Sequence, residues 1–448
     1  MTQNLYIWIY IMIIKRSLML AIAMASTTSA FAADKDIEAL KKELFNLKNA
    51  SEQRIQALEK RVENAEEQSE ETSEQTQQLA IDLSQQSNRK AANTFNPSIG
   101  VILNGKFLST PKDYEFALPG YFLGEEPGPG EQGLALGESE LNMSANIDDK
   151  FYGSLTLAFG EETEVEEAYI QTLNLPNGLG IKAGRFFSGI GYLNSHHAHT
   201  DDFSVRPLAY QAFLGPSFGD DGLQLTWLAP TDLYWETGVE LYRGESFPAA
   251  GADNQGKGVK TLFTHIGGDI TLNQSWRAGV SWLKADVDGR ESDGGESFSG
   301  NSELWLADFV WKWSPNGNAK DESIKIQGEY FTRTEKGDFT DSSSVTSDLD
   351  HKQNGWYVQS VYQFMPQWRV GLRYEELSSD ALPAAFDGTI LDDQGHDPQQ
   401  VSAMVDWSNS EFSRIRLQYM KDEASPKAAD LYMLQYIVSF GAHGAHSF

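Results

Sequence analysis

The sequence predicts an all-β protein, a transmembrane antiparallel β-barrel of about 16 strands with an N-terminal α-helical coiled coil. Three observations support this fold class. From Thr94 onward, apolar and polar residues alternate along segments of about ten residues. Tight turns alternate with long connections, and Trp and Tyr gather near the ends of the apolar faces. We therefore divide the chain into a signal peptide (1–33), a coiled coil (34–93) and a barrel (94–448).

The alternation is clearest in SELWLADFVWKWSP (302–315) and QWRVGLRYEEL (367–377). Trp305 and Phe309 share one side of the first stretch, and Leu372 lies on the apolar side of the second. Strands with one apolar face suit either a sandwich in water or a barrel in a membrane. Trp and Tyr near the strand ends favour the membrane, because these amphipathic rings gather at bilayer interfaces.

The connections between the candidate strands also favour a barrel. Tight turns such as 148–150 and 365–367 alternate with long loops such as 188–219, 286–301 and 337–354. Short turns on one side and long loops on the other are typical of bacterial outer-membrane barrels. A soluble sandwich has no reason to sort its loops in this way.

Residues 1–33 have the features of an export signal. Lys15 and Arg16 precede the apolar run SLMLAIAMAS, and AFA at 30–32 fits a small-x-small cleavage site. Met12 is an alternative start, because the apolar LYIWIYIMII before Lys15 is unusual in a signal peptide. A transmembrane anchor is disfavoured, since the basic pair interrupts the apolar run before it reaches the roughly 20 residues of a spanning helix.

Residues 34–93 contain no Gly or Pro and predict a helix. Apolar residues follow a coiled-coil spacing with one stutter, at Ile37, Leu40, Leu44, Leu47, Ile55, Leu58, Val62 and Ala65. So narrow an apolar stripe favours self-association, and we expect a short trimeric coiled coil in the periplasm. A single solvated helix or a disordered spacer is the alternative, because EEQSEETSEQTQQ interrupts the pattern.

The composition excludes several functions. Acidic residues outnumber Lys and Arg by 64 to 35, which gives a formal net charge of −29. We expect no nucleic-acid partner, because phosphates would be repelled. The chain has no Cys, so disulfides and thiol chemistry are excluded. The sequence lacks the H-E-x-x-H metalloprotease pattern and presents no nucleophile–base pair that we identify, so we expect no enzyme.

Several stretches resemble a known group of proteins. VEEAYIQTLNLPNGLGIKAGRFF (165–187) is similar to a strand–turn–strand unit of the phosphate-selective porin O/P-like superfamily. FNPSIGVILNGKF (95–107) and GYLNSHHAHTDDF (191–203) resemble more closely its relatives, zinc-regulated outer-membrane proteins that are also called TonB-dependent receptors. The resemblance implies sixteen strands, a trimer, and a multi-pass barrel in the outer membrane of a Gram-negative bacterium with its N-terminal region in the periplasm.

Two activities suggested by these family names disagree with the residues. A TonB-type transporter has a globular plug and a 22-stranded barrel, whereas residues 34–93 predict a coiled coil and leave no room for a plug. A phosphate-selective pore is expected to be cationic, whereas this chain carries a net charge of −29.

The stretch NSHHAHTDDF (194–203) concentrates residues that bind metals. In an extended segment alternate residues share a side, so His197, His199 and Asp201 would point together, with His196 opposite. Two imidazoles and a carboxylate can hold zinc at about 2.0–2.2 Å. The candidate metal ligands are therefore His196, His197, His199, Asp201 and Asp202, with His443 and His446 as a second, weaker candidate.

We expect the protein to need no cofactor. If these residues bind a metal ion, zinc is the one that they favour. By position, the resemblance implies that the third long loop folds into the barrel and narrows the pore, so that this stretch lines the constriction. Two alternatives remain open at this point: a pore lining that binds no metal, and a solvated polar loop.

Charged residues on the polar face of the strands are expected to line the lumen. They are Arg277, Lys325, Arg333, Arg369, Arg373, Arg414, Arg416, Glu236 and Glu240. A basic wall opposite an acidic third loop would set a transverse field across the pore. Alternatively, these arginines pair with lumenal Glu236, Glu240 or Glu329 and only stiffen the barrel.

We therefore expect a passive, water-filled outer-membrane channel for small hydrophilic solutes or ions, with divalent metal such as zinc among them. The alternative is a zinc-binding receptor or uptake component without general pore activity. A third possibility is a structural protein with a closed pore, whose coiled coil connects the barrel to periplasmic partners. Expected partners are outer-membrane lipid, further copies in a homotrimer, and the barrel-assembly machinery. The alternating residues from Tyr432 to Phe440, followed by a terminal Phe448, resemble the signal that this machinery recognises.

Overall fold

The computed structural model describes residues 97–441, apart from 125–126, 161–162 and 251–257, together with Phe45 and Lys48. The chain divides into two units, 1–94 and 95–448, and the barrel lies in the second. The predicted signal peptide lies outside the described residues, as does most of the predicted coiled coil, of which Phe45 and Lys48 are helical.

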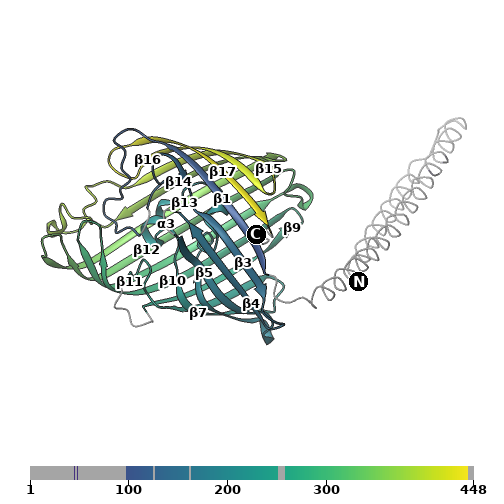
Figure 1. Ribbon diagram of the computed structural model, residues 1–448, viewed down its shortest axis with the longest axis horizontal. Coiled ribbons are helices and arrows are strands. Elements are labelled where there is room, and N and C mark those ends of the chain that lie inside the picture. Colours follow the sequence, from purple (N-terminus) through teal and green to yellow (C-terminus); the bar gives the residue numbers. More distant parts are fainter. Residues whose placement is uncertain are drawn as a thin grey trace, which may run out of the picture. The chain divides into compact units, whose positions relative to one another are not determined.

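The second unit is a closed antiparallel β-barrel (Figure 1). Strands β1 and β17 close it, with Gly100 opposite Gly441 and Ser109 opposite Tyr432. A short strand, β2, and the following β3 pair with successive parts of β1, so together they occupy one position and the barrel has 16 strands. The predicted antiparallel β-barrel and its number of strands are confirmed.

The strands follow one another around the barrel in chain order. They are β1 (Ser98–Ser109), β2 (Gly133–Leu136), β3 (Ser139–Asn146), β4 (Phe151–Phe159), β5 (Thr163–Thr172), β6 (Leu179–Phe187), β7 (Gly219–Leu228), β8 (Tyr234–Tyr242), β9 (Val259–Thr271), β10 (Gln274–Glu291), β11 (Ser297–Trp313), β12 (Ser323–Thr340), β13 (Thr346–Met365), β14 (Trp368–Ser379), β15 (Gln399–Ser410), β16 (Ser413–Glu423) and β17 (Ala429–Gly441). Between the strands, the described residues also form the α-helix α3 (Leu208–Leu214) and the short 3₁₀ turns Pro176–Gly178, Ala198–Thr200, Pro315–Gly317 and Ala384–Phe386.

The exterior of the barrel is apolar, as the alternation predicts. Trp305 and Phe309 on β11 are 49% and 47% exposed, and Leu372 on β14 is 65% exposed. Arg369 and Arg373, which alternate with the apolar residues of β14, point inward. A belt of exposed apolar side chains is the surface that a hydrocarbon environment requires, because every backbone group is already paired within the closed sheet.

Two predicted long loops are mostly strand. The structure continues β10 to Glu291 and starts β11 at Ser297, so 286–301 is a paired hairpin that ends in a short turn. The segment 337–354 behaves in the same way between β12 and β13. Both segments are rich in Gly, Ser and Asp and lack the exposed apolar face on which the prediction depended, because their few strand apolar side chains, such as Phe298 and Phe339, point into the barrel. Their strands reach 17 to 20 residues, well beyond the roughly 10 needed to cross a bilayer.

The long-loop end of the barrel contains an apolar core. Loop residues such as Tyr121 and Phe122 pack there against inward-facing wall residues such as Phe331, Phe339 and Leu377, and all of these side chains are buried. The expectation of a lumen filled with water along its length is therefore corrected at this end. The inward-facing residues of the strands are partly apolar at this end. The prediction missed this feature because it relied on the outward-facing Trp and Tyr residues.

Helix α3 lies inside the barrel, and all seven of its residues are buried. It packs against β13 at Gly355, where a Cβ would lie 2.4 Å from the Leu377 side chain and 2.9 Å from Phe213. Gly215 ends the helix in the left-handed conformation, with φ of 57°. Among the residues described, no helix combines the length and apolarity that crossing a bilayer demands.

A charge placed on the outer face tests the membrane-facing assignment. We expect Leu372→Arg to lower the free energy of unfolding in lipid vesicles by about 2–4 kcal/mol, because Arg is costly on the lipid face near mid-bilayer. Val345→Arg is the matched control, since Val345 is 57% exposed but lies in the turn between β12 and β13. Equal losses for the two variants in a urea titration would contradict the assignment.

Candidate functional site

The third loop, residues 188–218 between β6 and β7, folds into the barrel and is the centre of the candidate site. Asn194 holds the two ends of this loop together. Its side-chain amide donates to the carbonyls of Ser188 and Phe218, both at 2.8 Å, and its oxygen accepts from the Phe218 N–H at 2.7 Å. The loop therefore leaves and rejoins the wall at one point and spans the lumen between.

A buried carboxylate, Glu329 on β12, anchors the first part of the third loop. It accepts hydrogen bonds from the Tyr192 N–H at 3.0 Å and from the Tyr210 hydroxyl at 3.0 Å. The hydroxyl of Tyr357 on β13 donates to the same carboxylate at 2.5 Å. One wall residue thus ties both the start of the loop and helix α3 to the barrel.

Five wall arginines bind the backbone of the third loop. They donate to successive loop carbonyls: Arg277 to Gly191 at 3.1 Å, Arg414 to His199 at 2.7 Å, Arg416 to Asp201 at 2.9 Å, Arg373 to Val205 at 2.8 Å and Arg333 to Ala212 at 3.0 Å. Burying a carbonyl without a hydrogen-bond donor costs free energy, so these arginines make it possible for the loop to fold into the barrel.

The loop side chain Asp202 also binds the wall. It forms ion pairs with Arg369, at 3.0 Å, and with Lys325. Burial alone would raise the pKa of Asp202, but the charges of Lys325 and Arg369 outweigh it and hold the pKa well below its usual value. Asp202 is therefore an anionic anchor, and the structure does not place it with the histidines as a metal ligand.

The predicted pore-lining residues face the interior, with partners that differ from those expected. The arginines pair with Asp202, Asp406, Glu335 and Glu375 and with loop carbonyls, instead of Glu236, Glu240 or Glu329. Glu240 accepts hydrogen bonds from the Gly189 N–H at 3.0 Å and from the Gln224 side chain at 2.6 Å. Glu236 accepts one from the Tyr234 hydroxyl at 2.6 Å. The basic wall touches the acidic loop directly, so no open pore separates these charges.

The three loop histidines take the two predicted directions, but the segment is not extended, because residues 198–200 form a 3₁₀ turn. His196 turns away, and its Nδ1 lies 2.7 Å from the Tyr192 carbonyl. Burial and the nearby charge of Arg206 lower the pKa of His196 to about 4. His197 and His199 lie together with their rings stacked, at a centroid separation of 5.8 Å. Asp201 leaves this pair and binds Arg206 at 2.7 Å, so the structure does not place it among the metal ligands.

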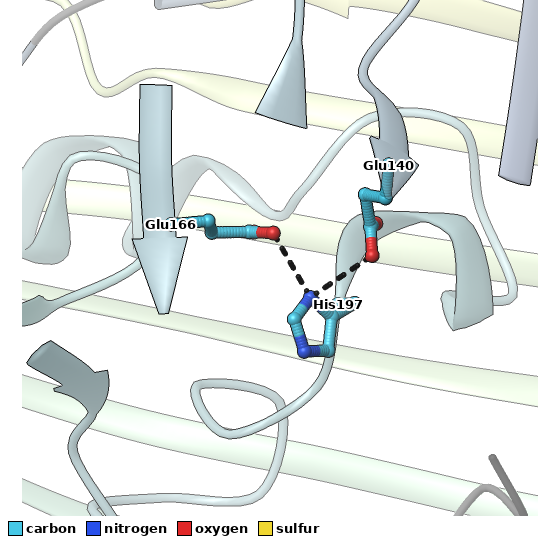
Figure 2. Close-up of side chains that lie close together, drawn as sticks. All are labelled: Glu140, Glu166 and His197. Carbon is cyan, nitrogen blue, oxygen red and sulfur yellow. Dashed lines mark hydrogen bonds and ion pairs between the residues drawn. The ribbon is translucent and has the colours of Figure 1, made fainter. Parts of the chain in front are cut away.

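His197 enters a group of carboxylates on β3 and β5 (Figure 2). Its Nδ1 lies 3.3 Å from Glu140 and 3.1 Å from Glu166, and its Nε2 lies 3.2 Å from Glu167. His199 Nδ1 approaches the other oxygen of Glu140 at 2.6 Å. We call His197, His199, Glu140, Glu166 and Glu167 the histidine–carboxylate cluster.

A β-bulge gives β5 two inward-pointing carboxylates. Glu167 pairs with Thr156 and Val165 with Leu157, so Glu166 is an extra residue between two regular pairs. Without the bulge, consecutive residues would point to opposite faces of the sheet. The bulge therefore turns both Glu166 and Glu167 toward His197.

The cluster is strongly acidic. Burial lowers the pKa of His197, but hydrogen bonds to Glu166 and Glu167 and the charges of Glu166 and Glu140 outweigh it and hold the pKa well above its ordinary value. Both ring nitrogens of His197 lie within hydrogen-bonding distance of a carboxylate, at 3.1 Å from Glu166 and 3.2 Å from Glu167. Nearby Glu138, which precedes β3, has its pKa raised to about 7 by burial, the charge of Glu166 and a hydrogen bond to it. The site can thus hold a proton or another cation between its carboxylates.

Sequence reasoning missed the four glutamates. Glu138, Glu140, Glu166 and Glu167 lie far from the histidines along the chain, and the barrel brings them to the loop. The Glu166–Glu167 doublet interrupts the alternation of its strand, and that was the available signal for a bulge. The second predicted pair, His443 and His446, lies outside the described residues.

Comparisons with known proteins identify a relative and a fold. No family model matches the chain. An uncharacterised protein of Aquifex aeolicus (strain VF5) is 30% identical over 385 residues, covering 79% of this chain and 80% of the relative. This chain belongs to the same family as that Aquifex protein.

Solved barrels resemble the chain in structure at low sequence identity. OmpTdeltaL8, a loop L8 deletion mutant of the Vibrio cholerae outer membrane protein OmpT, matches with a TM-score of 0.50 and 11% identity, covering 77% of this chain and 99% of that one. An anion-selective porin from Comamonas acidovorans matches with a TM-score of 0.49 and 11% identity, over the same shares. At such identities the likeness to OmpTdeltaL8 establishes the outer-membrane barrel fold alone.

Asn194 provides a test of how the third loop is held. We expect Asn194→Ala to lower the free energy of unfolding by about 2–3 kcal/mol, because three hydrogen bonds to buried backbone groups are lost. Asn146→Ala, at the exposed end of β3, is the matched control. Urea titration of the folded protein in vesicles measures both, and equal small changes would show that the loop is held by other contacts.

Proposed function

We propose that the protein is an outer-membrane channel through which small hydrophilic solutes or ions diffuse passively, past a third loop fixed across its lumen. The observation that carries the proposal is a closed barrel with an apolar exterior and a third loop bound inside by charged wall residues. An apolar belt suits lipid, and a loop held across a lumen restricts what passes.

The polar side of the lumen supports a path along β3 to β6. Inward residues there are small or polar and half-buried, in contrast to the apolar core at the long-loop end: Asn142, Ser144, Ser154, Gln171 and Lys182. Asn142 and Thr156 join across β3 and β4 through a hydrogen bond of 2.8 Å. Solutes following this path pass beside the histidine–carboxylate cluster.

Electrostatics favour cations on this path. The arginines that face the lumen are engaged by loop carbonyls and by carboxylates, whereas the cluster gathers several glutamates around two histidines. Fixed carboxylates beside a narrow path attract cations and repel anions. The net charge of −29 acts in the same direction.

The proposal includes a location and partners. We place the barrel in the outer membrane of a Gram-negative bacterium, surrounded by lipid, inserted by the barrel-assembly machinery and assembled as a homotrimer, with its N-terminal region in the periplasm. The barrel fold and the apolar belt support the location. The resemblance of residues 165–187 to a family of trimers supports the oligomer.

The histidine–carboxylate cluster favours a second candidate function. In this alternative the protein is a zinc-binding receptor or uptake component that captures the metal and conducts little else. The apolar core at the long-loop end favours this alternative, since it reduces the space open to solutes. Folded protein that binds zinc but passes no current would establish it over the channel.

Ion selectivity in planar bilayers tests the channel. We expect the full chain to pass current, with a reversal potential under a KCl gradient that shows K⁺ to be preferred over Cl⁻. The combined Glu166→Gln and Glu167→Gln variant is expected to lower the cation-to-anion permeability ratio at least about twofold, because two lumenal negative charges are lost.

Glu376→Gln is the matched control for that variant, because Glu376 lies on the outer face of β14, where it accepts a hydrogen bond from Tyr374 at 3.0 Å. It should leave the permeability ratio unchanged. Folded protein without conductance, or with a preference for anions, would overturn the proposed function.

A further inference from the structure

We infer that Glu140, Glu166 and His197 form a binding site for a divalent transition-metal ion, which joins the third loop to the wall of the barrel. The inference deepens the proposed function, on which it rests for the ion's access from solution, by naming a class of ion and its ligands. The three residues come from β3, β5 and the loop, and Figure 2 shows their side chains converging.

The spacing of the ligand atoms fits such an ion. One atom from each residue can be chosen so that all three lie within 4.8 Å of one another. His197 Nδ1 is 3.3 Å from Glu140 Oε2 and 3.1 Å from Glu166 Oε2. Ligands bound to zinc at 2.0–2.2 Å in a tetrahedron are about 3.3–3.6 Å apart. The site therefore needs only small side-chain adjustments to take up an ion.

Charge also favours a divalent cation. Oxygens of Glu140, Glu166 and Glu167 all lie within 3.3 Å of a ring nitrogen of His197. The nearby guanidinium of Arg206 is committed to Asp201 at 2.7 Å. Grouped carboxylates are costly to bury without positive charge, and a divalent ion supplies two charges at their centre.

Further contacts orient the ligands. The Nε2 of His197 is held by Glu167 at 3.2 Å, and His199 holds the second oxygen of Glu140 at 2.6 Å. Phe187 packs edge-on against the His197 ring, at 5.5 Å between centroids. Carboxylates that bind the outer nitrogen of a ligating histidine are a regular feature of metal sites, where they fix ring orientation and raise ligand basicity.

The donor set selects the class of ion. One imidazole with carboxylates suits zinc and its neighbours among the divalent transition metals, whereas calcium takes six to eight oxygen ligands. The chain has no Cys to supply thiolates, so bound metal is expected to be exchangeable. The His197 side chain is 22% exposed, which leaves access for the ion and a position for water.

Calorimetric titration of the full chain with zinc chloride, folded in detergent micelles, tests the site. We expect one zinc ion bound per chain, with cobalt giving the visible absorption of nitrogen and oxygen ligands and calcium giving no binding at the same concentration. His197→Ala should weaken zinc binding at least about 100-fold, and Glu167→Gln by about 10–100-fold.

Two further variants keep the test decisive. Glu166→Gln alters a partly exposed ligand on the bulge and replaces His197→Ala if that variant does not fold, as judged by its electrophoretic mobility before and after heating. His196→Ala is the matched control, since His196 points away from the cluster, and it should retain wild-type affinity.

The site is overturned if the folded wild type binds no zinc. It is also overturned if folded His197→Ala or Glu166→Gln retains wild-type zinc affinity, and loss of binding on replacing His443 and His446 would then assign the metal to those residues. Bilayer recordings on the same preparations separate the two proposals: conductance without zinc binding removes the site alone, and zinc binding without conductance removes the channel alone.

Discussion

A segment folded inside a closed barrel must find a partner for each buried backbone group, and the third loop meets this requirement through arginines of the wall. Each unpaired buried carbonyl would cost about 1–3 kcal/mol. The guanidinium is suited to this task because its several donors bind a carboxylate and a carbonyl at once. Arg416 binds Asp406 at 2.8 Å and the Asp201 carbonyl at 2.9 Å, and Arg373 joins Glu375 and Val205 in the same way. The same arginines therefore connect the carboxylates of the wall with the backbone of the loop.

The fixed loop gives the histidines their position. One side of the loop rests on Arg414 and Arg416, and the other side presents His197 and His199 to the carboxylates of β3 and β5. Positive and negative wall charges thus face each other with the loop between them. The field expected across an open pore instead acts across the loop, whose backbone carbonyls face the basic side and whose His197 and His199 rings face the acidic side.

The alternating pattern carried much of the fold. Residues such as Trp305 and Leu372 point outward, and Arg369 and Arg373 point inward, because strand geometry alone fixes which neighbours share a face. The alternating pattern did not predict the structure where pairing with neighbouring strands decided it. The hairpin around 286–301 has a polar outer face and only a few inward apolar side chains, Val287 and Phe298 among them, so the outward apolar pattern that marks the other strands is missing there. The bulge at Glu166 changes the face of one residue, and its cause lies in the pairing of β4 and β5.

The sequence by itself determined the barrel and the side of the wall on which each charge lies, since both depend on the short-range geometry of an extended strand. Only the tertiary structure decided the partners. Asp201 and Asp202 follow the histidines in the chain yet bind Arg206, Lys325 and Arg369, whereas His199 meets Glu140, 59 positions away. Partner choice depends on barrel closure and on the path of the loop, which set distances between residues that the chain itself leaves far apart.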